Sequence, residues 1–179
     1  MIEKIVEVLL FASSSPLSLG KLTRFTNSSK EEILRAITAL NESYEATGRT
    51  FRIQSVAGGY QLYTLPQYNK WLQPLLDEDK KRRRLSPASL ETLAIIVYNQ
   101  PITKPEIEAI RGVDSSGPLM TLLERGLIRT KGRAKRPGHP LLYVSSKEFL
   151  RYFGLNSLDD LPKREELEEL FKSGFPEKG

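Results

Sequence analysis

The sequence predicts a mainly α-helical protein with small β-hairpins, an α+β fold built from two tandem winged-helix domains. One observation is that the order of three helices, a hairpin and a closing helix is expected twice along the 179 residues. The other is that Pro-Leu-Ser at residues 16–18 matches Pro-Ile-Thr at residues 101–103, and residues 61–64 match residues 141–144. Two separate segments therefore support the same architecture.

The first helices of the N-terminal domain, residues 1–78, are predicted from spacing. Apolar side chains recur at helical intervals over residues 2–10, and Glu3 and Glu7 interrupt the uncharged stretch that a signal peptide would need. Residues 19–25 have the pattern of a short second helix. The domain is therefore expected to begin with two core helices.

A capping box and a hairpin complete this domain. Ser29 and Glu32 have the capping-box spacing that opens a third helix. Alternating apolar and polar residues at 51–56 and 60–64, separated by two glycines, predict a β-hairpin. A closing helix containing Pro74 follows. The inward positions of the third helix are predicted to be Ile33, Ile37, Leu40 and Tyr44.

A basic linker is predicted at residues 79–85, because the run DKKRRR carries too many like charges to be buried. Residues 86–154 are predicted to form the second winged helix. Ser86 offers an N-cap and Pro87 a first helical residue for an apolar helix that ends near Tyr98.

The next helix is specified closely by local signals. Thr103 and Glu106 have the spacing of a capping box, and Ile102 and Ile107 have the spacing of a hydrophobic staple. Gly112 then supplies the stop. This pattern is typical of the first two helices of a helix-turn-helix, although two ordinary core helices would fit the same residues.

The rest of the second domain repeats the pattern of the first. A helix is predicted from Pro118, and strands are predicted at residues 127–130 and 141–145 with a basic loop between them. Ser145 and Glu148 have the spacing of one more capping box, for a closing helix. The inward positions of the helix from Pro118 are predicted to be Leu119, Leu122 and Leu123.

Composition and charge narrow the class of protein. Apolar residues make up 39% and charged residues 27%, which is typical of a globular protein. No apolar run approaches the length of a membrane span, and the absence of cysteine excludes disulfides and is compatible with the cytoplasm. The net charge of +5 arises from residues 79–84 and 85–151, each at +4, whereas residues 1–78 are neutral and residues 152–179 carry −3. Residues 155–179 are expected to be a partly ordered tail.

The sequence carries no enzyme signature, and no cofactor or metal is expected. His139 is the single histidine and lies in the predicted loop of the second hairpin, where contact with solvent or phosphate is the simpler interpretation. Asp159 and Asp160 are adjacent, so the two carboxylates would not converge on one substrate.

Contact with DNA is supported by the second hairpin, whose loop and flanks are basic. Arg133, Lys135 and Arg136 are the candidate contacts for a non-specific interaction with phosphates, although a solvated basic loop would have the same composition. The basic residues 80–84 add to this charge. Sequence-specific reading is poorly supported, because the helix from Pro118 exposes a mixed set of side chains for base contacts. That set is Met120, Thr121, Glu124 and Arg125.

Two helices have more apolar surface than one core face requires. The helix from Leu90 to Tyr98 is apolar nearly all round, and in the first helix Val8 and Phe11 lie outside the main stripe. These second faces are either interfaces with other chains or surfaces that the rest of this chain covers. Val8 and Phe11 are the candidates for a dimer interface.

The residues quoted so far resemble a known family. The second half, with LETLAIIVYNQPIT and KEFLRYFGL, is similar to the signature half of bacterial segregation and condensation protein B. The first half, with LLFASSSPLSLGKL and VAGGYQLYTLPQY, is similar to the same family. The resemblance covers all but about the last dozen residues and implies a tandem winged-helix protein.

The resemblance implies partners as well as a fold. It implies a homodimer, formed mainly through the N-terminal domain, that binds the kleisin ScpA with its C-terminal domain and reaches the SMC ATPase through that kleisin. Such a non-enzymatic subunit would act in chromosome condensation and segregation, in the cytoplasm at the nucleoid. The candidates for kleisin contact are Val97, Tyr98, Ile102 and Met120, of which Ile102 could instead serve only as a staple. The alternative function is a DNA-binding transcriptional regulator with tandem winged helices.

Overall fold

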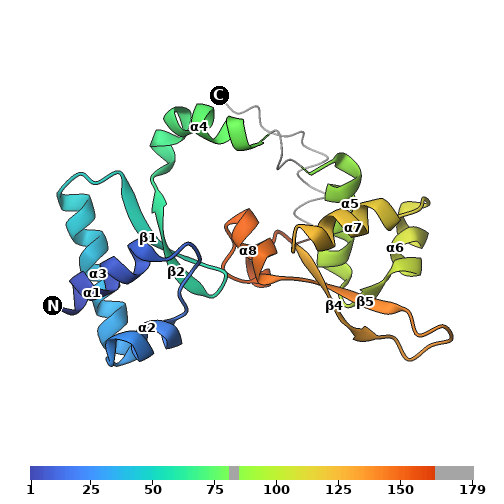
Figure 1. The fold of residues 1–179 in the computed structure, drawn as a ribbon, viewed down its shortest axis with the longest axis horizontal. Coiled ribbons are helices and arrows are strands. Elements are labelled where there is room, and N and C mark those ends of the chain that lie inside the picture. The colour runs from blue at the N-terminus through green and yellow to red at the C-terminus, as the bar shows by residue number, and fades with distance from the viewer. Residues whose placement is uncertain (81–84, 164–179) are drawn as a thin grey trace.

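The computed structural model describes residues 1–80 and 85–163 and contains two separate hydrophobic cores. Figure 1 shows the first half of the chain on one side and the second half on the other, with α8 between the bodies. We refer to residues 1–80 as the N-terminal unit and to residues 85–163 as the C-terminal unit. Within these described ranges, no helix has the length and apolar character needed to cross a bilayer.

The N-terminal unit has three helices followed by an antiparallel hairpin and a further helix, as predicted. Its elements are α1 (Ile2–Ala12), α2 (Leu19–Thr26), α3 (Lys30–Ala46), β1 (Phe51–Val56), β2 (Gly59–Thr64), the 3-10 turn η1 (Pro66–Tyr68) and α4 (Asn69–Lys80). The Ser29–Glu32 capping box begins α3: the Ser29 N–H donates to Glu32 Oε2 at 2.7 Å, and the Glu32 N–H donates to Ser29 Oγ at 3.2 Å. All four predicted inward positions of α3 are buried.

The hairpin of this unit is attached to the corner before α2. The N–H groups of Leu17 and Tyr60 each donate to the other residue's carbonyl at 2.9 Å. Gly59 allows this approach, because a Cβ atom there would lie 2.9 Å from the carbonyl of Leu17. Leu17 corresponds to Ile102 in the repeat, and Ile102 pairs with Tyr143, so the structural equivalent of Tyr143 is Tyr60. The sequence match of residues 61–64 with residues 141–144 is therefore three residues out of register.

The C-terminal unit repeats this order and adds a short strand before its second helix. Its elements are α5 (Pro87–Asn99), β3 (Ile102–Thr103), α6 (Lys104–Arg111), α7 (Ser116–Glu124), β4 (Ile128–Arg133), β5 (Leu141–Ser145), α8 (Lys147–Phe153) and the 3-10 turn η2 (Leu158–Asp160). The sheet order is β3-β5-β4, and Ile102 lies opposite Tyr143. The predicted mainly α fold with small hairpins is confirmed.

The signals that start and end α6 are also present. Glu106 Oε2 accepts hydrogen bonds from the Thr103 N–H at 2.9 Å and from the Thr103 hydroxyl at 2.6 Å. Ile102 and Ile107 are both buried in one core, as a staple requires. Gly112 ends the helix with a left-handed φ of 74°, a conformation that glycine adopts without steric cost.

Several boundaries differ from the sequence prediction. The predicted linker 79–85 begins inside α4, which extends to Lys80, and ends at Leu85, which is buried in the C-terminal core; residues 81–84 lie outside the described residues. The helix predicted from Pro118 begins two residues earlier, at Ser116. Leu123, predicted to face inward, is exposed.

The second hairpin and the helix after it also differ. Strand β4 extends to Arg133, because a bulge between Thr130 and Arg133 lets the ladder continue into the predicted loop. Helix α8 is capped by Ser146 instead of Ser145, since the Phe149 N–H donates to Ser146 Oγ at 3.1 Å. The Ser145 N–H and hydroxyl instead donate to Gln100 Oε1 at 2.6 and 3.0 Å, which ties β5 to the end of α5.

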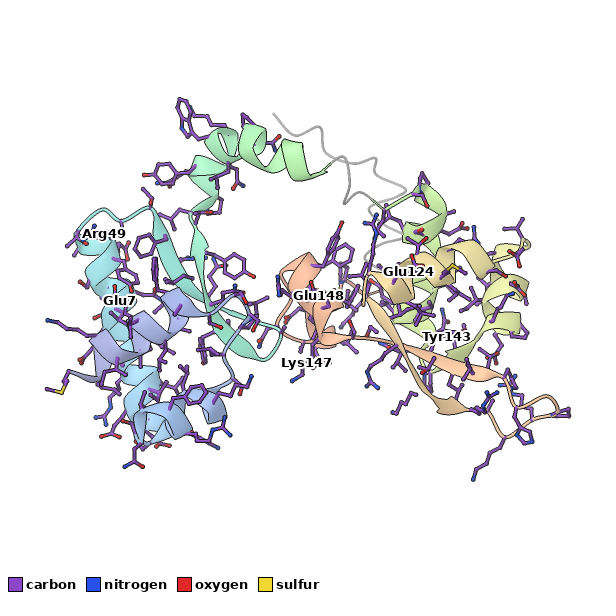
Figure 2. The ribbon with its side chains drawn as sticks, in the orientation of Figure 1. Glu7, Arg49, Glu124, Tyr143, Lys147 and Glu148 are labelled. Atoms are coloured by element: carbon purple, nitrogen blue, oxygen red, sulfur yellow. The ribbon has the colours of Figure 1, made fainter. Side chains whose placement is uncertain are left out.

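The two units touch at the tip of the first hairpin. The Ala57 N–H donates to the Leu155 carbonyl at 2.8 Å, and Asn156 Oδ1 accepts from the Ser55 hydroxyl at 2.9 Å and from the Gly58 N–H at 3.1 Å. Figure 2 shows Glu148, at the start of α8, beside this tip. The described part of the predicted tail, residues 155–163, is therefore a structural element that holds both units.

Candidate functional site

The C-terminal unit carries an apolar groove. It has a volume of about 360 Å³ and lies between α5, α8 and the segment that follows α8. We refer to it as the C-terminal groove. Its lining residues are Leu90, Leu93, Ala94, Val97, Tyr98, Phe149, Phe153, Leu155, Leu161 and Pro162.

The groove exists because α5 is apolar on more than one side. Leu93, Ile96 and Val97 are buried in the core, whereas Leu90 is 45% exposed at the rim. Phe153 forms the opposite rim from α8, at 44% exposure. An apolar helix of this kind needs cover beyond its own core, and the groove is the part that the described residues leave open.

The segment after α8 supplies the end of the groove. Leu155 and Leu161 pack against the C-terminal core, and the Tyr98 hydroxyl donates to the Pro162 carbonyl at 2.8 Å. Asp160 Oδ2 accepts from the Ser157 N–H at 2.9 Å, so the turn between these leucines has a defined shape. The prediction of a partly ordered tail from residue 155 onward does not describe this segment. The spacing of Leu155, Leu158 and Leu161 is the signal that could have shown an apolar face.

The four predicted kleisin contacts lie in three different environments. Val97 and Tyr98 line the C-terminal groove. Ile102 is buried among the core residues, so the structure removes it from the candidate surface and leaves the staple as its role. Met120 is 61% exposed on α7 and does not line the groove. Leu90 belongs to the helix whose surplus apolar surface was predicted, but it was not among the predicted contacts. Phe153 and the residues after α8 were not predicted.

A second hollow lies on the N-terminal unit between α1 and α3. It has a volume of about 700 Å³, and both predicted dimer residues, Val8 and Phe11, line it. Phe11 is 81% exposed and Val8 is 57% exposed. We refer to this surface as the N-terminal face.

The floor of the N-terminal face is held by one buried hydroxyl. The Tyr44 hydroxyl donates to Glu7 Oε1 at 2.8 Å and joins α3 to α1. Burial, followed by this hydrogen bond, raises the pKa of Tyr44 above its ordinary value, so the phenol stays protonated and remains a donor. Figure 2 shows Glu7 and Arg49 on this side of the unit.

The predicted DNA contacts lie in the β4–β5 hairpin, and two of them have internal partners. Arg136 Nη2 lies 2.7 Å from Glu106 Oε1, and Arg133 Nη1 donates to the His139 carbonyl at 2.9 Å. Lys135 is exposed. The hydrogen bonds from Thr103, and then from Arg136, lower the pKa of Glu106 from 4.5 to about 2. The carboxylate is therefore charged near neutral pH.

The described residues contain no arrangement that resembles a metal centre. Within residues 1–80 and 85–163, no group of three potential metal-ligating His, Cys, Asp or Glu side chains occurs. His139 lies in the loop of the second hairpin with a φ of 41° and has its carbonyl bonded to Arg133.

Comparison with known proteins identifies the family. The model of the family "Segregation and condensation complex subunit ScpB" matches residues 4–164. The segregation and condensation protein B of Symbiobacterium thermophilum is 48% identical over 88% of this chain and 71% of that protein, and the protein of the same name from Syntrophotalea carbinolica is 42% identical over 96% of this chain and 86% of that protein. A solved structure, described as a conserved hypothetical protein from Chlorobium tepidum, is 42% identical over 86% of this chain and 96% of that chain, with a TM-score of 0.42. The chain therefore belongs to the segregation and condensation protein B family.

Proposed function

We propose that this chain is a non-enzymatic, homodimeric subunit that binds the kleisin ScpA and regulates the SMC complex at the nucleoid. In this proposal residues 1–78 form the dimer and residues 86–154, with the segment that follows, bind the kleisin. Membership of a family of segregation and condensation complex subunits supports the role. The single observation that carries the binding site is the apolar C-terminal groove.

The chemistry of the groove favours an amphipathic helix as its occupant. Its lining is almost wholly apolar, and the open rims of Leu90 and Phe153 leave room for side chains that enter from outside. An amphipathic helix places apolar residues on one face at intervals of three and four residues and buries them in such a groove. Each Leu or Phe side chain that becomes buried contributes about 1.5–3 kcal/mol.

Capture of the kleisin's central segment tests this site. Leu90→Glu and Phe153→Glu place a charge at partly exposed rim positions, and each is expected to weaken binding by about tenfold or more because the charge would lose its hydration on binding. Ile110→Glu, at an exposed position of α6 outside the groove, is the matched control. Met120→Glu separates the groove from the exposed face of α7. Full binding by both rim variants, measured by calorimetry, would exclude the groove.

The N-terminal face supports the dimer part of the proposal. Phe11 is the most exposed aromatic residue with a described side chain, and it adjoins Val8 on the same helix. Phe11→Glu is expected to convert the dimer to monomer in light scattering, because a carboxylate at a packed interface would be desolvated without a partner. Phe25→Glu, at another exposed aromatic position of the same unit, serves as the control. An unchanged mass for Phe11→Glu would reject this interface.

A further inference from the structure

The second hairpin carries a cluster of positive side chains that lies outside the proposed kleisin-binding groove. We define the wing as residues 129–140, which comprise most of β4 and the loop to β5. We propose that the wing is a binding site for the phosphate backbone of duplex DNA, without sequence preference. This site would add a DNA contact to the protein contacts proposed above, and it does not depend on them.

The wing carries five positive side chains and no acidic one. All five are exposed, and the part of β4 from Arg129 to Arg133 is exposed on both of its faces. Figure 1 shows the hairpin extending away from the helices of its unit. The positive residues are Arg129, Lys131, Arg133, Lys135 and Arg136.

Hydrogen bonds hold the wing loop in one shape. The Ala134 N–H donates to the Pro140 carbonyl, and the His139 N–H donates to the Arg136 carbonyl, both at 2.9 Å. The guanidinium of Arg133 bonds to the His139 carbonyl. A preformed loop loses less conformational entropy on binding than one that must first become ordered.

The five cations divide into two groups by their partners. Arg133 and Arg136 shape the loop through the bonds to His139 and Glu106. Among the described residues, the side chains of the other three have no hydrogen-bond or ion-pair partner. These three are Arg129, Lys131 and Lys135.

The nearby acidic groups do not cancel this charge. Glu106 is paired with Arg136, and Glu108 and Asp114 both lie within 3.5 Å of Lys104 Nζ. Figure 2 shows Glu124 far from the tip of the wing, toward the other end of the unit. The wing therefore remains a positive projection.

Duplex DNA suits this projection better than a short acidic peptide does. Strand β4 has six residues, which span about 20 Å at a rise of about 3.3 Å per residue. A duplex presents one phosphate charge per about 1.7 Å of its axis, so that length faces about a dozen negative charges. Base reading is not expected, because the exposed face of α7, the helix that would enter the major groove, presents Met120 and Glu124.

Fluorescence anisotropy with a short labelled duplex of mixed sequence tests the proposal on the full chain. The variant R129Q/K131Q/K135Q removes the three unpartnered cations and leaves the loop bonds in place. Between ~50 and ~200 mM salt, the slope of log affinity against log salt is expected to fall in magnitude by about 2–3, with about a tenfold or greater loss of affinity at the lower salt. The variant R129K/K131R/K135R keeps the charge and should retain the affinity.

A matched variant removes the same charge from the N-terminal unit. K21Q/K30Q/R35Q changes three exposed cations there and should leave both the slope and the affinity unchanged. Equal weakening by the two glutamine variants would overturn the wing site, and so would duplex binding unaffected by R129Q/K131Q/K135Q. Tighter binding of polyglutamate than of duplex would assign the wing to an acidic protein, and protection of one defined operator would contradict the lack of sequence preference. Kleisin capture by R129Q/K131Q/K135Q should remain intact, which separates this result from the proposed function.

Discussion

The two units have the same order of helices and hairpin, but their hairpins do different things. In the N-terminal unit the turn at Ala57 and Gly58 is short, and its N–H groups donate to the segment after α8. In the C-terminal unit a seven-residue loop, residues 134–140, projects away from the helices and carries positive charge. Loop length and charge therefore distinguish the hairpin that joins the two units from the hairpin that we propose meets DNA.

The helices that carry the proposed interfaces differ in a similar way. α1 buries Val6 and Leu10 and leaves Phe11 fully open on an otherwise ordinary amphipathic helix. α5 buries one side in the core and turns another into the groove that α8 and residues 155–162 enclose. The hollow beside Phe11 has a mixed polar and apolar lining, whereas the lining of the groove is almost wholly apolar. An exposed aromatic residue on the first surface suits a symmetric contact between copies, and the apolar groove suits an inserted segment.

The largest effect that tests the independence of the two units comes from truncating their cores. Leu22→Ala and Leu122→Ala each remove a side chain with no exposed surface, and each is expected to cost about 2–5 kcal/mol of unfolding free energy. Peptide-level hydrogen exchange should show faster exchange in residues 1–64 for the first and in residues 86–154 for the second. Uniformly faster exchange for either variant would mean that the units unfold as one.

The next largest loss of unfolding free energy is expected where a side chain hydrogen-bonds the sheet of each unit to a helix. Asn41 exchanges two hydrogen bonds with the Ile53 backbone, at 2.8 and 3.0 Å, and Gln100 accepts from the Ser145 N–H. Asn41→Ala and Gln100→Ala are each expected to destabilise the chain by about 1–3 kcal/mol, because a partly buried N–H is left without an acceptor. Urea denaturation measures the loss. Asn41→Asp and Gln100→Glu keep the acceptor and should recover part of it.

A smaller difference is expected between the two capping boxes. Ser29→Ala and Thr103→Ala each remove a capping hydroxyl, with an expected cost of about 0.5–2 kcal/mol in thermal or urea unfolding. The Thr103 variant should lie at the upper end, because Thr103 is buried and Ser29 is exposed. Thr103→Ser restores the hydroxyl and is the control. A larger cost for Ser29→Ala would contradict this assignment.

The smallest effect is the pH dependence that Glu106 contributes. Its folded pKa of about 2 lies below the ordinary value of 4.5, so its stabilisation is fully present above pH 4.5 and is lost as the pH falls toward 2. The stability difference between wild type and Glu106→Gln should therefore be constant from pH 5 upward and shrink below pH 4.5. Its size is expected to be at most about 1 kcal/mol, because both Glu106 and Arg136 are partly exposed. A difference that grows on acidification would contradict the lowered pKa of Glu106.

Much of the secondary structure followed from short-range signals. The Ser29–Glu32 and Thr103–Glu106 boxes and the Gly112 stop were all predicted, since each depends on residues within one or two helical turns. Errors occurred where several choices were locally equivalent. Ser145 and Ser146 could each cap α8, and the sheet decided between them by pairing Ser145 with Gln100.

The candidate site was only partly predictable, because part of it depends on contacts between residues that are distant in the sequence. The surplus apolar surface of α5 is visible in the sequence, and it predicts Val97 and Tyr98 as contacts. Whether Ile102 was accessible depended on strand pairing with Tyr143, which buries it. Phe153 and Leu161 joined the groove only through packing of segments that lie more than fifty residues away along the chain.

The sequence by itself determined the order of the elements, their caps and the presence of unmatched apolar and basic surface, because these depend on spacing and composition. The tertiary structure alone decided which surface remains open. Packing of residues 155–162 beside α5 enclosed the groove, and the ion pair to Glu106 separated Arg136 from the unpartnered cations of the wing. Such contacts join residues that no local pattern connects.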